Sequence, residues 1–102
     1  MSPETAPEIL ESEWAPDSGF FWNIRQGRFV KEEYERALRK LEAISVAEGA
    51  MIPRRLVSLL WYIPTFMEWQ RERVRENGGN VEEFKKAITR MTNEVERVLG
   101  VP

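Results

Sequence analysis

The sequence contains no cysteine and no histidine, and its only aspartate is Asp17. Without cysteine the chain can form neither a disulfide nor a thiolate metal site, which suits a reducing compartment. Without histidine it lacks the usual general base near neutral pH and the commonest metal ligand. A calcium loop of the EF-hand type needs several acidic or amide ligands at fixed spacing, and that pattern is also missing. We therefore expect neither an enzyme nor a protein that holds a metal or a cofactor.

Long apolar runs are missing as well. The most apolar stretch lies between Leu56 and Met67 and is interrupted by Ser58, Pro64 and Thr65. It is far shorter than the roughly 20 residues that span a bilayer. The N-terminus also lacks the basic and apolar regions of a signal peptide. These features predict a soluble, cytoplasmic protein that does not bind a membrane.

What the chain does contain is enough material for one domain with one core. It has 102 residues, of which 42% are hydrophobic and 31% are charged. The net charge is only −2, but the first 24 residues carry five acidic groups and no basic one. These five are Glu4, Glu8, Glu11, Glu13 and Asp17. Three prolines in the same region predict a largely irregular arm over residues 1–17, followed by a helical domain over residues 18–102.

An acidic arm on a nearly neutral body favours a basic partner. The competing interpretation is a solvated chain end with no binding role. The acidic candidates for partner binding are Glu8, Glu11, Glu13 and Asp17.

The first expected helix of the domain is short and aromatic. It covers residues 18–26, with Asp17 or Ser18 as its N-cap and Gly27 as its stop. Its apolar side chains cannot all lie on one face; they are Phe20, Phe21, Trp22 and Ile24. Some of them must face either the core or a partner, and both interpretations stay open.

Three longer helices should follow. Residues 30–46 carry an apolar stripe of helical period, and residues 53–76 carry a half that is apolar nearly all round. In this third helix we expect Trp61, Phe66 and Trp69 to be core, and Pro64 to produce a kink or a break.

The fourth helix has the clearest periodicity in the chain. Asn77-Gly78-Gly79 precedes it, Asn80 caps it, and Gly100 ends it. Apolar residues recur along it at alternating intervals of three and four; they are Val81, Phe84, Ile88, Met91, Val95 and Val98. The predicted fold is therefore all-α: an irregular bundle of three long helices plus a short aromatic N-terminal helix.

No group of residues predicts a reaction. The adjacent pairs Glu32-Glu33 and Glu82-Glu83 lie in first helical turns, where acidic residues complement the helix dipole. Arginines cluster at Arg54-Arg55 and again between Arg71 and Arg75. A nucleic-acid surface usually gives a domain a pI above about 9. The sequence pI here is 5.3, which favours a solvated helix face.

Two segments resemble a known family. Residues 18–29, SGFFWNIRQGRF, resemble the SFFW-x-(L/I)-R-x-G-x-F opening of small immunity proteins from bacterial polymorphic toxin systems. Residues 60–69, LWYIPTFMEW, are similar to a second block of the same proteins. Together the two segments cover less than a quarter of the chain. The resemblance implies a bacterial protein that binds and blocks a toxin domain made by the same cell.

The resulting hypothesis is a stoichiometric inhibitor that occludes a cognate toxin domain, such as a basic nuclease. Besides the acidic arm, the expected binding residues are Phe20, Phe21, Trp22, Arg25 and Arg28. One alternative is a helical adaptor that forms a homodimer through the apolar seam of the fourth helix. A second is a nucleic-acid-associated regulator that uses the arginine faces.

Overall fold

Helices make up about two-thirds of the chain in the computed structural model, which describes all residues from 1 to 102 and contains no strand. The prediction of an all-α protein is therefore confirmed. In chain order the elements are α1 (Ala6–Glu11), the 3-10 turn η1 (Ser12–Trp14), α2 (Phe20–Arg25), α3 (Lys31–Glu42), α4 (Arg54–Leu60), α5 (Ile63–Trp69), α6 (Arg71–Glu76) and α7 (Val81–Leu99). Only α3 and α7 exceed seven residues, so the bundle has two long helices instead of three.

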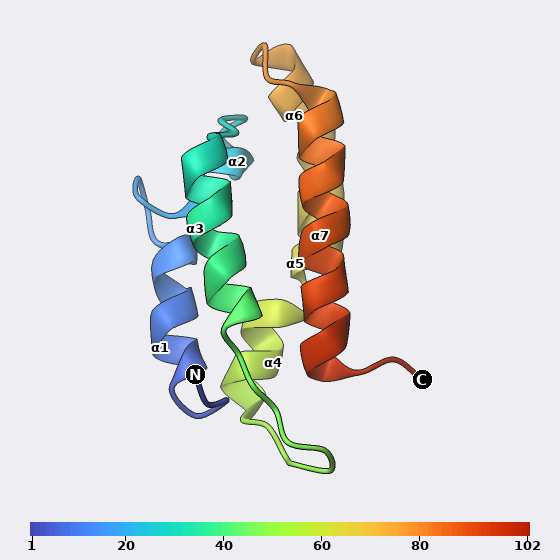
Figure 1. The fold of residues 1–102 in the computed structure, drawn as a ribbon. Helices are drawn as coiled ribbons and strands as arrows, with labels where there is room; N and C mark the ends of the chain where they lie inside the picture. The colour runs from blue at the N-terminus through green and yellow to red at the C-terminus, as the bar shows by residue number, and fades with distance from the viewer.

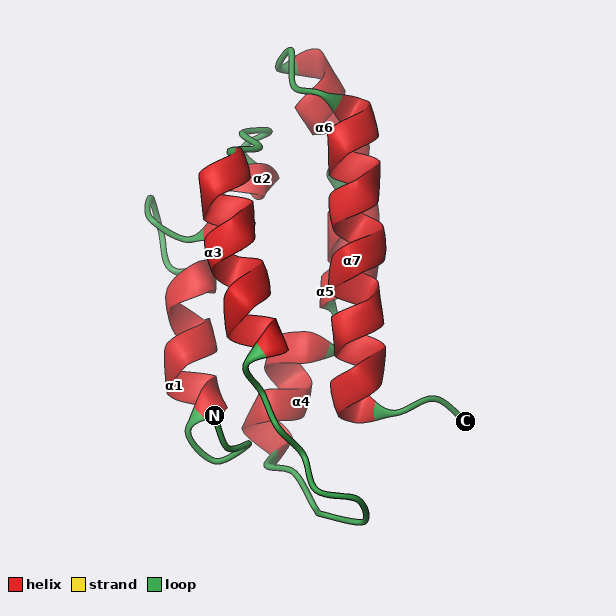
Figure 2. Cartoon of the chain, viewed as in Figure 1, coloured by secondary structure: helices red, strands yellow, loops and turns green.

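The helices form two groups that pack side by side (Figure 1). In the first group α1 lies beside α3, and α2 packs against the N-terminal end of α3. In the second group α5 and α6 run along α7. The short helix α4 crosses the base of the molecule and contacts α1, while α3 and α7 join the two groups directly. Figure 2 shows that the longest loop, between α3 and α4, extends beyond this base.

The apolar seam of α7 faces the core, as its periodicity predicts. Asn80 caps the helix, and its side-chain oxygen accepts the backbone N–H of Glu83 at 3.1 Å. All seam residues after Val81 are buried against α3, α5 and α6. The seam is thus used inside the chain, which removes the surface that a dimer through this helix would need.

The predicted second helix is shorter at both ends and ends at Glu42. Its C-terminus is held by Arg97 of α7, whose guanidinium donates hydrogen bonds to the carbonyl oxygens of Leu41 and Ile44 at 3.0 and 2.9 Å. A cation at this position satisfies carbonyl groups that have no partner within the helix. Arg97 therefore fastens α3 to α7 at the base of the molecule.

The predicted third helix is three short helices. Pro64 is the second residue of α5, where its missing N–H costs nothing, so it begins a helix instead of bending one. The chain turns at Trp61 and Tyr62, and α4 lies across the base whereas α5 runs along α7 (Figure 1). A second break falls at Gln70, whose buried side chain donates a hydrogen bond to the carbonyl oxygen of Phe66 at 3.2 Å.

The largely irregular arm expected over residues 1–17 contains α1 and η1, which together cover nine of these residues. Ala6 and Leu10 of α1 are fully buried, and the helix packs against α3 and α4. The prolines misled because Pro7 lies in the first turn of α1, where a helix tolerates proline. The N-terminal ammonium of Met1 also donates a hydrogen bond to the carbonyl oxygen of Ala43 at 2.9 Å.

Two glycines allow close approaches around α2. Gly19, not Asp17 or Ser18, is the N-cap, and a Cβ there would clash with the carbonyl oxygen of Glu13. Gly27 ends the helix with a φ of 82°, and a Cβ there would lie 2.8 Å from the carbonyl oxygen of Arg73. Gly27 therefore both provides the left-handed residue that ends α2 and allows α2 to approach α6.

The two roles of Gly27 can be separated by comparison with Gly78, which has a φ of 80° and open space around its Cβ position. We expect Gly78→Ala to lower the free energy of unfolding by about 1–2 kcal/mol, the strain of the left-handed backbone alone. Gly27→Ala should cost about 1–2 kcal/mol more because the α2–α6 contact must also open. Equal losses in urea denaturation of the two variants would show that the close approach contributes nothing.

Candidate functional site

Three of the residues that were expected to bind a partner are buried. Phe20 and Phe21 have at most 1% of their surface exposed, and Glu13 also has 1%. The ring of Phe21 stacks on Trp14 at 4.5 Å, and the ring of Phe20 lies 6.0 Å from Tyr34. Because these side chains have no free surface, the prediction that they contact a partner is corrected: they belong to the core.

Glu13 is the centre of a buried ionic cluster. Its carboxylate accepts hydrogen bonds from Arg36 at 2.7 and 2.9 Å, from Lys40 at 2.5 Å and from the backbone N–H of Phe20 at 3.1 Å. Burial by itself would raise the pKa of Glu13, but the hydrogen bonds from Arg36, Lys40 and Phe20 outweigh it and lower the pKa to about 2. Glu13 is therefore ionised and fully paired, and it is not available as a general acid or as a partner ligand.

Arg28 is exposed, but its guanidinium is engaged within the chain. Its guanidinium donates a hydrogen bond to the side-chain oxygen of Asn23 at 2.6 Å. The amide nitrogen of Asn23, which is buried, donates to both carboxylate oxygens of Glu33 at 3.1 and 3.0 Å. This chain of hydrogen bonds fixes the segment after α2 against the first turn of α3.

The other predicted residues remain accessible. Glu8, Glu11, Asp17 and Arg25 are exposed, and Trp22 is half-buried. Glu11 forms an ion pair with Arg55 at 2.9 Å. Glu4, Glu8 and Asp17 form no ion pair, so three of the five acidic side chains near the N-terminus are free on the surface.

The most exposed aromatic side chains are ones that the sequence placed in the core. Trp61 is 59% exposed and Trp69 is 64% exposed, which corrects the prediction that both are buried. The ring of Tyr62 lies between them, with centroids 5.5 Å from Trp61 and 5.7 Å from Trp69. We call these three residues the tryptophan face.

The tryptophan face rests on the core through Phe66, a ring that also contacts a cation. The ring of Tyr62 lies 5.8 Å from that of buried Phe66, and the guanidinium of Arg25 lies 5.3 Å from the centroid of Phe66. Arg25 forms no ion pair, and a guanidinium over an aromatic ring is held in place by a cation–π attraction. Aromatic rings beside a free arginine are typical of the centre of protein–protein interfaces.

The sequence carried a signal for this face that was missed. The segment from Leu56 to Trp69 is apolar nearly all round, and such a helix needs neighbours on every side. A bundle of this size supplies neighbours for Leu56, Leu59, Leu60 and Ile63 but leaves the opposite side without a layer. Surplus apolar residues in a small domain thus indicate an exposed binding face.

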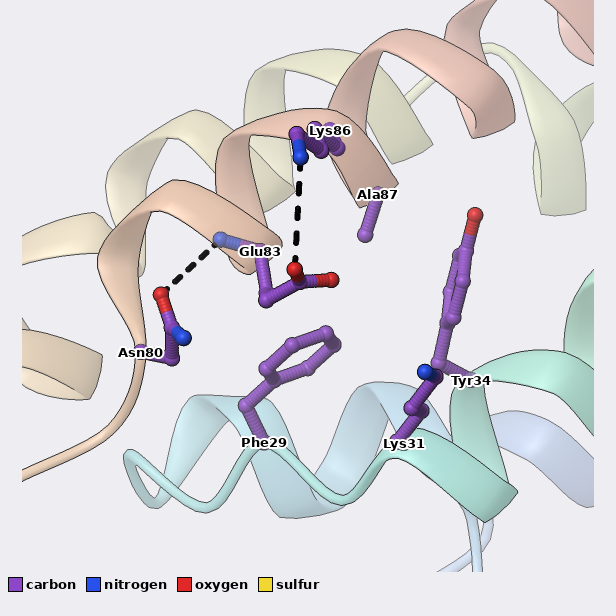
Figure 3. Close-up of a pocket in the computed structure, with 7 residues that line it drawn as sticks. All are labelled: Phe29, Lys31, Tyr34, Asn80, Glu83, Lys86 and Ala87. Carbon is purple, nitrogen blue, oxygen red and sulfur yellow. Dashed lines mark hydrogen bonds and ion pairs between the residues drawn. The ribbon is translucent and has the colours of Figure 1, made fainter.

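A second surface feature is a cleft between the first turns of α3 and α7, with a volume of about 240 Å³ (Figure 3). Its lining consists of Phe29, Lys31, Tyr34, Asn80, Glu83, Lys86 and Ala87. The rings of Phe29 and Tyr34 lie 6.0 Å apart, and partial burial raises the pKa of Tyr34. The structure contains no group of acidic, histidine or cysteine side chains that could hold a metal ion.

Most arginines of the two basic clusters form contacts within the chain. Arg71 pairs with Glu68 at 2.9 Å, and Arg75 pairs with Glu72 at 3.0 Å. Arg73 donates a hydrogen bond to the carbonyl oxygen of Arg25 at 2.8 Å. Because Arg55 also pairs with Glu11, three of the five arginines in the two clusters are neutralised within the chain, which weakens the case for a nucleic-acid-associated regulator.

Neither family models nor curated protein sequences nor solved structures provide a match to this chain. The structure also contains no helix that combines the length and the apolar character needed to cross a membrane. The segments 18–29 and 60–69 meet in space. Phe21 and Arg25 of the first segment both contact Phe66 of the second, with ring centroids 6.3 Å apart for the phenylalanine pair.

The Glu13 cluster leads to a prediction about stability. Because the pKa of Glu13 is lower in the folded protein than its ordinary value of 4.5, its contribution is complete above pH 4.5 and is lost as the pH falls towards 2. Glu13→Gln should therefore lower the free energy of unfolding by about 2–3 kcal/mol at pH 7, and the difference from the unmodified protein should vanish near pH 2.

Glu8→Gln is the matched control, because Glu8 is exposed and pairs with no cation. We expect it to change the free energy of unfolding by less than about 0.5 kcal/mol. The measurement is urea denaturation of the three proteins between pH 7 and pH 2. A pH-independent difference for Glu13→Gln would mean that the pKa of Glu13 is the same in the folded and the unfolded protein, so that the cluster does not stabilise its charge.

Proposed function

We propose that this chain is a toxin-neutralising immunity protein that binds a cognate bacterial toxin domain through the tryptophan face and catalyses no reaction. The observation that supports this most is the pair of exposed side chains, Trp61 and Trp69, on either side of Tyr62. Covering the exposed parts of the two indole rings would contribute about 5 kcal/mol to association. That is enough to make the face the energetic centre of an interface.

The class of partner rests on the resemblance of residues 18–29 and 60–69 to immunity proteins. All three residues of the tryptophan face lie in the second of these segments, and Arg25 lies in the first. Aromatic side chains that stay exposed in the isolated chain contribute little to the stability of its fold. A role in binding therefore explains them better than a role in folding. A toxin domain that such a face covers would be blocked by occlusion of its active site or of its substrate groove.

The free acidic side chains suit a basic toxin such as a nuclease. Glu4, Glu8 and Asp17 are exposed and have no cationic partner within the chain. Charges at the rim of an interface mainly accelerate association, whereas buried aromatic anchors slow dissociation. The acidic residues and the tryptophan face would therefore contribute to different rate constants.

A helical adaptor is the alternative. It would use the same tryptophan face, because the seam of α7 is occupied inside the chain. The two functions differ in the consequence of binding, since an immunity protein abolishes the activity of its partner and an adaptor does not.

The test uses the product of the neighbouring gene as the partner in surface plasmon resonance. We expect Trp61→Ala and Trp69→Ala each to accelerate dissociation by roughly 30-fold or more, the effect of losing about 2 kcal/mol at a hot spot. Met51→Ala is the control, because Met51 is 92% exposed on the distant loop before α4. Glu8→Lys should slow association at low salt and have little effect at high salt.

Melting curves accompany each variant and should stay within a few degrees of the unmodified protein, because the substituted side chains are largely exposed. Dissociation rates that both tryptophan substitutions leave unchanged would contradict the assigned face. Binding without any loss of the partner's activity would favour the adaptor. A chain that binds no neighbouring gene product would contradict both functions.

A further inference from the structure

The cleft between α3 and α7 is built from two kinds of side chain. Its apolar lining consists of the rings of Phe29 and Tyr34 on one side and the methyl group of Ala87 on α7 (Figure 3). The ring of Phe29 also contacts the core, because it lies edge-on to the ring of buried Phe84 with their centroids 5.2 Å apart. The apolar lining is therefore anchored to the core, as it is in preformed small-molecule sites.

The rim of the cleft is polar and carries more positive than negative charge. Lys31 forms no ion pair, and Lys86 approaches the carboxylate of Glu83 only to 4.0 Å. The backbone N–H of Glu83 is taken by Asn80, which fixes this edge of the cleft (Figure 3). Two ammonium groups and one carboxylate leave the lining with a net charge of +1.

The volume of the cleft limits what can fill it. A cavity of roughly 150 Å³ holds a benzene molecule, whereas sites for drug-sized ligands begin at about 300 Å³. At about 240 Å³ the cleft accommodates one aromatic ring together with a short polar group. A larger ligand would extend into solvent.

We propose that this cleft binds a small aromatic carboxylate, with its ring on Phe29 and Tyr34 and its carboxylate between the ammonium groups of Lys31 and Lys86. The ring would gain edge and face contacts with two aromatic side chains. The carboxylate would pair with Lys31, which has no other partner, and would compete with Glu83 for Lys86. This site shares no residue with the tryptophan face and is independent of the toxin-binding function.

Phenylacetate is the probe, with benzylamine as its counterpart of opposite charge and toluene as its uncharged counterpart. The readout is the Ala87 methyl resonance in carbon–proton correlation spectra, because Ala87 lines the cleft and is buried. We expect saturable shifts with phenylacetate and a dissociation constant on the order of a millimolar, the range for a ligand of this size. Benzylamine should bind at least several-fold more weakly.

Three lysine substitutions test the rim. Lys31→Gln and Lys86→Gln should each weaken phenylacetate binding by roughly threefold to fivefold, as expected for exposed ion pairs. Lys85→Gln is the matched control, because Lys85 neighbours Lys86 and pairs with the third residue before it in the same way, but does not line the cleft. All three positions are exposed, so the variants should fold normally.

Any of three results would overturn the proposal. The first is the absence of a saturable shift with phenylacetate. The second is benzylamine binding as tightly as phenylacetate, which would make Glu83 the recognising group and the ligand a cation. The third is equal weakening by Lys85→Gln, which would mean that only the overall charge matters. The same aromatic carboxylate could belong to a free small molecule or to an aromatic residue at the C-terminus of a polypeptide, and N-acetyl-phenylalanine distinguishes the two. Tighter binding than that of phenylacetate indicates the C-terminal residue, and weaker binding indicates the free small molecule.

Discussion

The arrangement of the N-terminal half depends on one buried carboxylate. Glu13 is reached by Arg36 and Lys40 of α3 and by the first backbone N–H of α2, so three elements meet at its two oxygen atoms. A carboxylate of this kind is stable in the interior only when every partner is in place. Its position sets those of its neighbours: Gly19 packs against the Glu13 carbonyl, and Trp14 stacks on Phe21. The acidic residue with the least exposure thus organises the aromatic core.

This constraint also explains which aromatic side chains are left for binding. Once η1 and α3 enclose the first turn of α2, Phe20 and Phe21 complete the core. The core then needs only one side of α4 and α5, and the tryptophan face remains uncovered. A small domain buries a smaller fraction of its surface than a large one, and in this bundle no further layer covers the outer side of α4 and α5. The exposed tryptophans therefore follow from the size of the bundle.

The sequence predicted those elements whose signals are local. The cap at Asn80 and the apolar period of α7 required no knowledge of the rest of the chain, and both are confirmed. The expectation of an irregular arm missed how this region packs, because the partners of Glu13 lie 23 and 27 residues away in the sequence. No local pattern shows such contacts. The prediction that Trp61 and Trp69 are buried was wrong. Periodicity shows that a helix has apolar sides, but it does not show how many neighbouring helices cover them. The cleft was not anticipated, since it joins residues some 50 positions apart that share no motif.

The proposed division of roles, with an acidic N-terminal region that is partly structural and a tryptophan face that binds, requires Glu13 to be a permanently ionised part of the fold. The most direct test is the carbon chemical shift of the Glu13 carboxyl group, followed by NMR from pH 7 to pH 1.5. The account predicts a titration midpoint near 2, accompanied by a shift of the Phe20 amide proton, which donates its hydrogen bond to the Glu13 carboxylate. A midpoint near the ordinary value of 4.5 would contradict it, because Glu13 would then be a solvated residue on a loosely attached arm.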